Sequence, residues 1–141
     1  MNTWILRLLR TLLGVIFIYA SFAKIIHPAQ FAEAVHNYRI LPDGFINIFA
    51  IILPWLEFTS GLCLILAVFE LPSLLIVSGL GVMFLAAVSA NLVRGLDVAC
   101  GCFSTDPQAE ANMISSLLFD LGLLIVCALA LTAHFRRVKK A

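Results

Sequence analysis

Charged residues are scarce in this sequence. Only 12% of its 141 residues are Asp, Glu, Lys or Arg, about half the share of a soluble domain, whereas 62% are hydrophobic. A chain of this length has room for one domain, whose core is too small to hide so much apolar surface from water. The composition therefore excludes a water-soluble globule and indicates a protein that lies in lipid.

Other absences narrow the class further. Nine Lys and Arg against eight Asp and Glu give a net charge of +1, so the chain lacks the basic excess that binds nucleic acid. Its four cysteines are too scattered for a small disulfide-rich scaffold. No glycine-rich phosphate loop, internal repeat or low-complexity segment occurs in the sequence. We therefore expect a lipid environment and no nucleic-acid partner.

Four apolar stretches are long enough to cross a bilayer, which takes about 20 helical residues. They cover residues 4–23, 45–69, 73–93 and 113–133. The alternation of apolar and polar residues that a transmembrane barrel needs is absent from the sequence. We therefore predict an all-α integral membrane protein, a four-transmembrane-helix bundle that forms a single domain over residues 1–141.

Basic residues near the span ends predict the orientation. Six lie near the two chain ends, namely Arg7, Arg10, Arg136, Arg137, Lys139 and Lys140. Three lie in the longer connections, namely Lys24, Arg39 and Arg94. We therefore expect both termini to be cytoplasmic in a bacterial inner membrane, with residues 24–44 and 94–112 outside and a short cytoplasmic hairpin at 70–72. A secretory signal cleaved after residue 23 is the alternative for the first span.

The connections and the third span carry local signals. Apolar residues at helical spacing within 29–38 predict a short helix on the membrane surface. Asp106 followed by Pro107 is typical of a helix start, so the fourth helix is expected to begin ahead of its apolar stretch. Close helix packing is indicated by the small residues of the third span, namely Gly79, Gly81, Ala86, Ser89 and Ala90.

Cys100-Gly101-Cys102 is the most specific chemical signal. Two cysteines one residue apart close only a small, strained and reducible ring, and Gly101 supplies the backbone freedom it needs. An outer position ahead of a helix adds an oxidising compartment and a dipole that favours thiolate. We interpret Cys100 and Cys102 as a redox-active pair. A structural disulfide, two inert thiols and half of a metal site stay open, although zinc would need a second pair of ligands, so we expect no metal.

The remaining cysteines and histidines have simpler interpretations. Cys63 and Cys127 lie within spans, where free cysteine packs as a small apolar residue, and a relay to the outer pair is the alternative. His27, His36 and His134 are isolated in the sequence; His27 and His36 are interpreted as surface residues rather than ligands, and His134, beside the basic tail, as an interfacial residue.

Glu57 and Asp120 are the acidic residues expected deep inside spans, where an ionisable group is costly and marks a candidate functional site. Both are expected in the outer half of the bundle, facing one another. Lys24 is the expected partner of Glu57, Arg94 is the other candidate cation, and Asn91 adds an amide to this polar cluster. The cluster is either a structural ion pair that fixes helix register or a proton carrier and contact for a quinone-like electron acceptor.

Short motifs follow one another from the first span to the start of the fourth. They are Phe22-Ala23-Lys24-Ile25 with Pro28 and Phe31, Tyr38 with Leu41-Pro42, Leu53-Pro54-Trp55-Leu56-Glu57 with Gly61, Asn91 with Arg94-Gly95, and Cys100-Gly101-Cys102-Phe103. In this order they resemble the MauE/DoxX-like family of small redox-associated membrane proteins. Ser104 departs from the family pattern, in which Gly follows the last of these motifs.

The resemblance implies a four-helix membrane protein with Cys100 and Cys102 as its redox element and Lys24, Glu57 and Arg94 as its polar cluster. The MauE branch is associated with maturation of methylamine dehydrogenase, whose small subunit carries many disulfides, and with a periplasmic thioredoxin-like partner. We therefore expect thiol-disulfide exchange at the periplasmic face, with a thioredoxin-like protein or a disulfide-containing client.

Several points stay open at this stage. Catalytic turnover, as a thiol-disulfide oxidoreductase, needs an electron acceptor or donor in the membrane, and a quinone beside Glu57 is the expected one. A non-catalytic assembly subunit and a small transporter-like bundle are the alternatives. The sequence leaves open whether the chain forms a homo-oligomer.

Overall fold

The computed structural model describes residues 3–95 and 113–141, which form five helices and no strand. The helices are α1 (Thr3–Ile26), α2 (Pro28–Asn37), α3 (Asp43–Leu66), α4 (Glu70–Arg94) and α5 (Met113–Lys140). All except α2 are long and apolar enough to cross a membrane. The predicted all-α bundle with four spans is confirmed.

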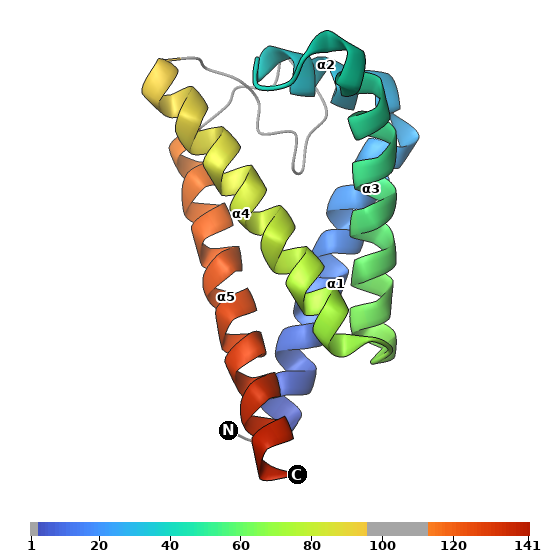
Figure 1. Cartoon of the computed structure of the whole chain (residues 1–141), viewed down its shortest axis with the longest axis vertical. Coiled ribbons are helices and arrows are strands. Elements are labelled where there is room, and N and C mark those ends of the chain that lie inside the picture. The colour runs from blue at the N-terminus through green and yellow to red at the C-terminus, as the bar shows by residue number, and fades with distance from the viewer. Residues whose placement is uncertain (1–2, 96–112) are drawn as a thin grey trace.

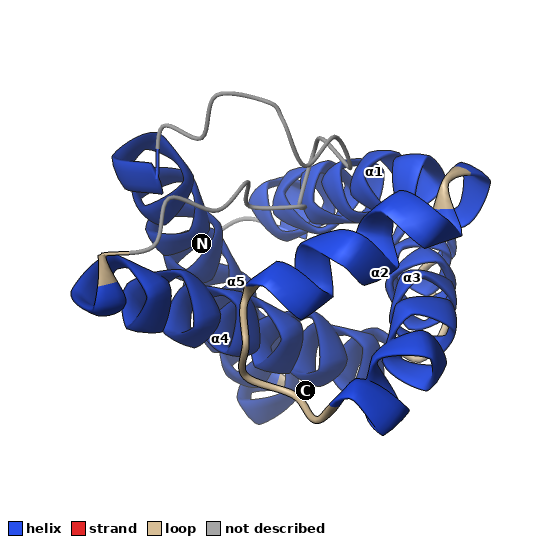
Figure 2. Cartoon of the chain, turned by 90° about the horizontal axis from the view of Figure 1, so that it is seen from above, coloured by secondary structure: helices blue, strands red, loops and turns tan. Residues whose placement is uncertain are grey.

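The long helices pack as two antiparallel pairs, α1 with α3 and α4 with α5 (Figure 1). The pairs lie close together at the end that holds both termini and diverge toward the end where α2 lies. Seen from that end, α2 crosses the bundle (Figure 2), and it packs on α3 and α1. The basic residues of the two tails therefore gather at one end of the molecule.

Gly14 and Gly61 allow the close approach of α1 and α3. A Cβ added to Gly14 would lie 2.7 Å from the carbonyl oxygen of Gly61, and one added to Gly61 would lie 2.8 Å from that of Gly14. Backbone atoms cannot yield as a flexible side chain can, so this crossing requires glycine on both helices.

The prediction of close packing by the small residues of α4 was right at one glycine and wrong at the other. At Gly81 an added Cβ would lie 3.0 Å from Leu124 of α5. Gly79 has open space around it and Ala86 is exposed. Two residues turn a helix by about 200°, so Gly79 and Gly81 lie on different faces of α4.

The turn between α3 and α4 lies earlier than predicted. It is made by residues 67–69, with left-handed φ values of 62° at Ala67 and 52° at Phe69. The second span therefore ends at Leu66, and Glu70 opens α4 instead of forming a hairpin. Pro72 fits there because amide groups in the first turn of a helix have no intrahelical acceptor.

The short helix predicted at 29–38 is present as α2, but the surroundings of its apolar face were predicted wrongly. Phe31, Ala34 and Val35 are buried against protein rather than spread on a lipid surface. The two helix pairs diverge at this end, and α2 covers the apolar side chains there with its own apolar face.

Candidate functional site

Lys24 and Glu57 form a buried ion pair between α1 and α3. The Nζ of Lys24 donates to both carboxylate oxygens of Glu57 at 2.9 Å, and each side chain is 1% exposed. Side chains on a helix lean toward its N-terminus, so the side chains of two antiparallel helices lean in opposite directions and can meet at the interface. The ion pair that the sequence predicts is present.

Two aromatic rings enclose the ammonium group of Lys24. Its Nζ lies 5.3 Å from the ring centroid of Phe31 on α2 and 4.8 Å from that of Phe84 on α4. A cation within about 6 Å of a ring centroid is attracted to the face of the ring. The ion pair thus contacts four helices, α1 to α4.

Asp120 of α5 lies beside the same ion pair. Together with Lys24 and Glu57 it lines a cavity of about 20 Å³. Asp120 is buried, and its Oδ2 has no hydrogen-bond partner among the described residues. A cavity of this size has room for about one water molecule. This cavity is therefore smaller than the quinone expected beside Glu57.

Asn91 and Arg94 are not part of this polar cluster. Asn91 is fully buried, and within the described residues its amide has no hydrogen-bond partner. Arg94 is exposed, and its Nη1 donates to the carbonyl oxygen of Arg39 at 3.4 Å. The sequence analysis grouped Arg94 with Glu57 because both were expected toward the outer face, but Arg94 ends its helix and bonds to the connection between α2 and α3.

Cys100 and Cys102 lie outside the described residues, as do Asp106 and Pro107. The connection that carries them joins the end of α4 to the start of α5 at Met113. Both of these helix ends lie at the end of the bundle opposite the termini (Figure 1).

Cys63 and Cys127 are free thiols within α3 and α5. Cys127 is buried and Cys63 is partly buried. These positions agree with the interpretation of both residues as packing residues.

A second polar cluster lies at the end that holds the termini. Glu70 accepts a hydrogen bond from Arg10 of α1. Its other oxygen lies 3.3 Å from Nδ1 of His134 and 3.9 Å from Nη1 of Arg137, both on α5. The first residue of α4 therefore ties α1 to α5. Sequence reasoning missed this link, although an acidic residue between two spans at a strongly basic end was a usable signal.

Metal binding has no candidate in the part of the chain that the structure describes. Within residues 3–95 and 113–141, no group of three His, Cys, Asp or Glu side chains is placed to hold an ion.

Comparison with known proteins identifies the family. The family model for methylamine utilisation protein MauE matches residues 2–133, which include α1 to α4 and most of α5. The chain belongs to the MauE family. Family membership and four apolar helices make it a multi-pass bacterial membrane protein.

Two relatives show what share of a MauE protein this chain covers. Methylamine utilization protein MauE of Paracoccus denitrificans is 32% identical over 124 residues, which cover 87% of this chain and 64% of the relative. That of Methylorubrum extorquens is 32% identical over 106 residues, covering 74% and 57%. The chain thus spans about three fifths of the length of these relatives. No solved structure matches it.

Proposed function

We propose that this MauE-family protein serves methylamine utilisation by thiol-disulfide exchange at the end of the bundle opposite its termini. The observation that carries the proposal is the family match over residues 2–133, within which the sequence has the pair Cys100 and Cys102. The name of the family supplies the process, and the chemistry of two closely spaced thiols supplies the reaction class.

The exchange moves one electron pair between the cysteine pair and the dithiol of a thioredoxin-like partner. A partner thiolate attacks one sulfur of the Cys100–Cys102 disulfide, so that a mixed disulfide forms and the other cysteine leaves as thiolate. The partner's second thiolate then attacks the mixed disulfide, which closes the partner's disulfide and releases the second cysteine. The partner loses two electrons and two protons, the cysteine pair gains them, and the reverse sequence oxidises the pair.

The bundle supports this role as a rigid platform. The Lys24–Glu57 ion pair holds α1 to α4 together, while the connection with the cysteines follows directly on α4. A thiol pair outside the spans can meet a water-soluble partner, whereas Cys63 and Cys127 lie within spans. A transporter-like role has less support, because the cavity between Glu57 and Asp120 holds about one water molecule.

Trapping of a mixed disulfide tests the proposal. In a C63A/C127A background, Cys100→Ser and Cys102→Ser each leave one thiol for a thioredoxin-like partner that lacks its own resolving cysteine. We expect one of these variants to form a covalent adduct that a reductant dissolves, and the C100S/C102S control to form none. If neither variant forms an adduct and C100S/C102S still supports growth on methylamine, the protein is instead a non-catalytic assembly subunit.

A further inference from the structure

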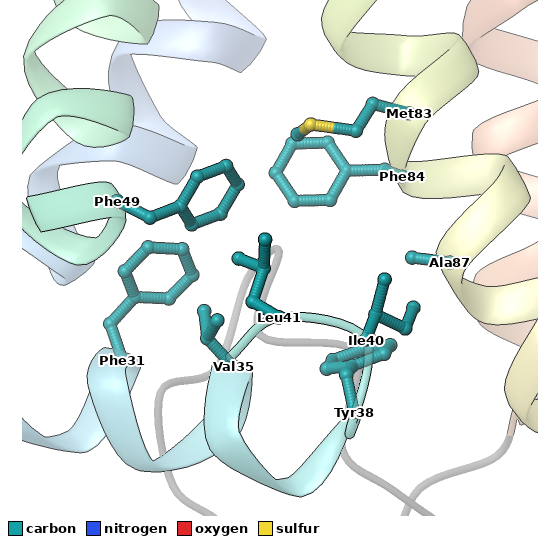
Figure 3. Close-up of a pocket in the computed structure, with 9 residues that line it drawn as sticks. All are labelled: Phe31, Val35, Tyr38, Ile40, Leu41, Phe49, Met83, Phe84 and Ala87. Atoms are coloured by element: carbon teal, nitrogen blue, oxygen red, sulfur yellow. The ribbon is translucent and has the colours of Figure 1, made fainter. Parts of the chain in front are cut away.

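An apolar pocket of about 150 Å³ lies between α2, α3 and α4 at the end that α2 covers. Figure 3 shows the side chains around it, among them Phe31, Tyr38, Ile40, Phe49, Met83 and Phe84. Carbon atoms form nearly the whole wall. An apolar cavity of about this volume accommodates a benzene-sized hydrocarbon. The pocket therefore suits a hydrocarbon group and offers little to a polar one.

Two arginines lie close to this pocket without lining it. Arg39 stands between Tyr38 and Ile40, which both line the pocket, and the carbonyl oxygen of Arg39 accepts a hydrogen bond from Arg94 at 3.4 Å. Both arginines are exposed, and neither forms an ion pair with any residue that the structure describes. The pocket thus combines an apolar interior with two nearby arginines that have no ion-pair partner among the described residues.

The arginines and the pocket wall lie at different depths in the membrane, as the headgroup and the acyl chains of a lipid do. Arg94 is the last residue of α4, a helix long enough to cross the bilayer, and so lies near headgroup level. Met83 and Phe84 lie about 15 Å further along α4, at 1.5 Å per residue. That offset places the pocket wall at the level of acyl chains when the two arginines are at the level of phosphates.

We propose that the pocket binds one anionic phospholipid, with an acyl chain against Phe84 and the phosphate between Arg39 and Arg94. Guanidinium groups bind phosphate through paired, charge-assisted hydrogen bonds. A zwitterionic lipid offers the same chain but neutralises its own phosphate. A quinone ring would bury two carbonyl oxygens against a wall that is almost entirely carbon, which is unfavourable.

Native mass spectrometry of the full chain, titrated with phosphatidylglycerol or phosphatidylcholine of identical acyl chains, tests the role of the two arginines. We expect one phosphatidylglycerol to bind, about 20-fold more tightly than phosphatidylcholine, and the R39Q/R94Q variant to lose that preference. The matched control is R136Q/K139Q, which removes two exposed charges from the opposite end and should bind as wild type does. Unchanged binding of phosphatidylglycerol to R39Q/R94Q would overturn the proposal.

A second pair of variants tests the pocket itself. Ala87 lines the pocket, whereas Ala86 is exposed on the neighbouring face of α4. We expect Ala87→Phe to fill the pocket and weaken binding of both lipids at least tenfold, while Ala86→Phe binds both as wild type does; circular dichroism verifies the helix content of each. Equal binding by the two variants overturns the site. Displacement of phosphatidylglycerol by ubiquinone, with equal potency in wild type and R39Q/R94Q, assigns the pocket to a quinone instead and overturns the proposal.

Discussion

Lys24 and Glu57 meet across the interface of α1 and α3, where the Nζ of Lys24 lies 2.9 Å from both carboxylate oxygens of Glu57. Each of the two side chains is only 1% exposed. Each charge has lost its hydration, so each depends on the other. Such a pair contributes little net stability over apolar residues, but removing one partner is strongly unfavourable. The pair lies on the same two helices as Gly14 and Gly61, with Glu57 one turn from Gly61.

Removal of one partner of this pair should destabilise the fold. Lys24→Met leaves a buried carboxylate without its cation, for an expected loss of about 3–5 kcal/mol in the free energy of unfolding. The K24M/E57M double variant should recover most of that loss, because the carboxylate that Lys24 neutralised is removed as well. Reversible unfolding in mixed micelles measures both values. A single variant as stable as wild type would contradict the dependence of each charge on the other.

The glycine crossing predicts a contrast between two Gly→Ala substitutions. Gly14→Ala places a Cβ at 2.7 Å from the backbone of Gly61, so α1 and α3 must separate, for an expected destabilisation of about 1–3 kcal/mol. Gly79→Ala enters open space and should be neutral or stabilise by up to about 1 kcal/mol through helix propensity. Thermal unfolding of both variants checks the contrast, and equal midpoints would argue against a special role for Gly14.

Glu70 should stabilise the end of the bundle that holds the termini. Glu70→Gln removes the charge shared by Arg10, His134 and Arg137, for an expected loss of about 1–3 kcal/mol that shrinks as salt is raised. Hydrogen exchange should show the first turn of α4 opening more often. Glu33→Gln, on the exposed side of α2, is the control and should change neither property.

Asp120→Asn tests whether the carboxylate at the small cavity is needed for stability or for function. No described residue donates a hydrogen bond to Oδ2 of Asp120, so the amide should change the free energy of unfolding by no more than about 1 kcal/mol. Growth on methylamine at normal protein levels would show that the carboxylate of Asp120 is not needed for function. Loss of growth with unchanged stability would assign Asp120 a part in proton transfer.

The orientation can be checked with single cysteines. In a background without native cysteines, Gly44→Cys and Ala141→Cys occupy exposed positions near opposite ends of the bundle. We expect a membrane-impermeant maleimide to label position 44 in intact spheroplasts and position 141 only after lysis, since basic residues favour the cytoplasmic side. The reverse pattern would contradict cytoplasmic termini.

Family, spans and the central ion pair were accessible from the sequence because lipid penalises charge. A bilayer core tolerates few ionisable groups, so Lys24 and Glu57 stand out against long apolar runs, and the order of short motifs around them identifies the MauE family. The same logic failed for Arg94, which lies at a helix end where lipid headgroups and solvent remove the penalty.

Tertiary structure decided which faces of the spans meet. In water, burial separates apolar from polar residues, but in a membrane both the protein interior and the lipid surface are apolar. Leu64 is fully buried and Leu62 is 40% exposed, although the two residues are chemically identical. Hydropathy therefore determined that four helices cross the membrane, whereas the pairing of α1 with α3 through Gly14 and Gly61, and the closure of the bundle by α2, followed only from side-chain shape in three dimensions.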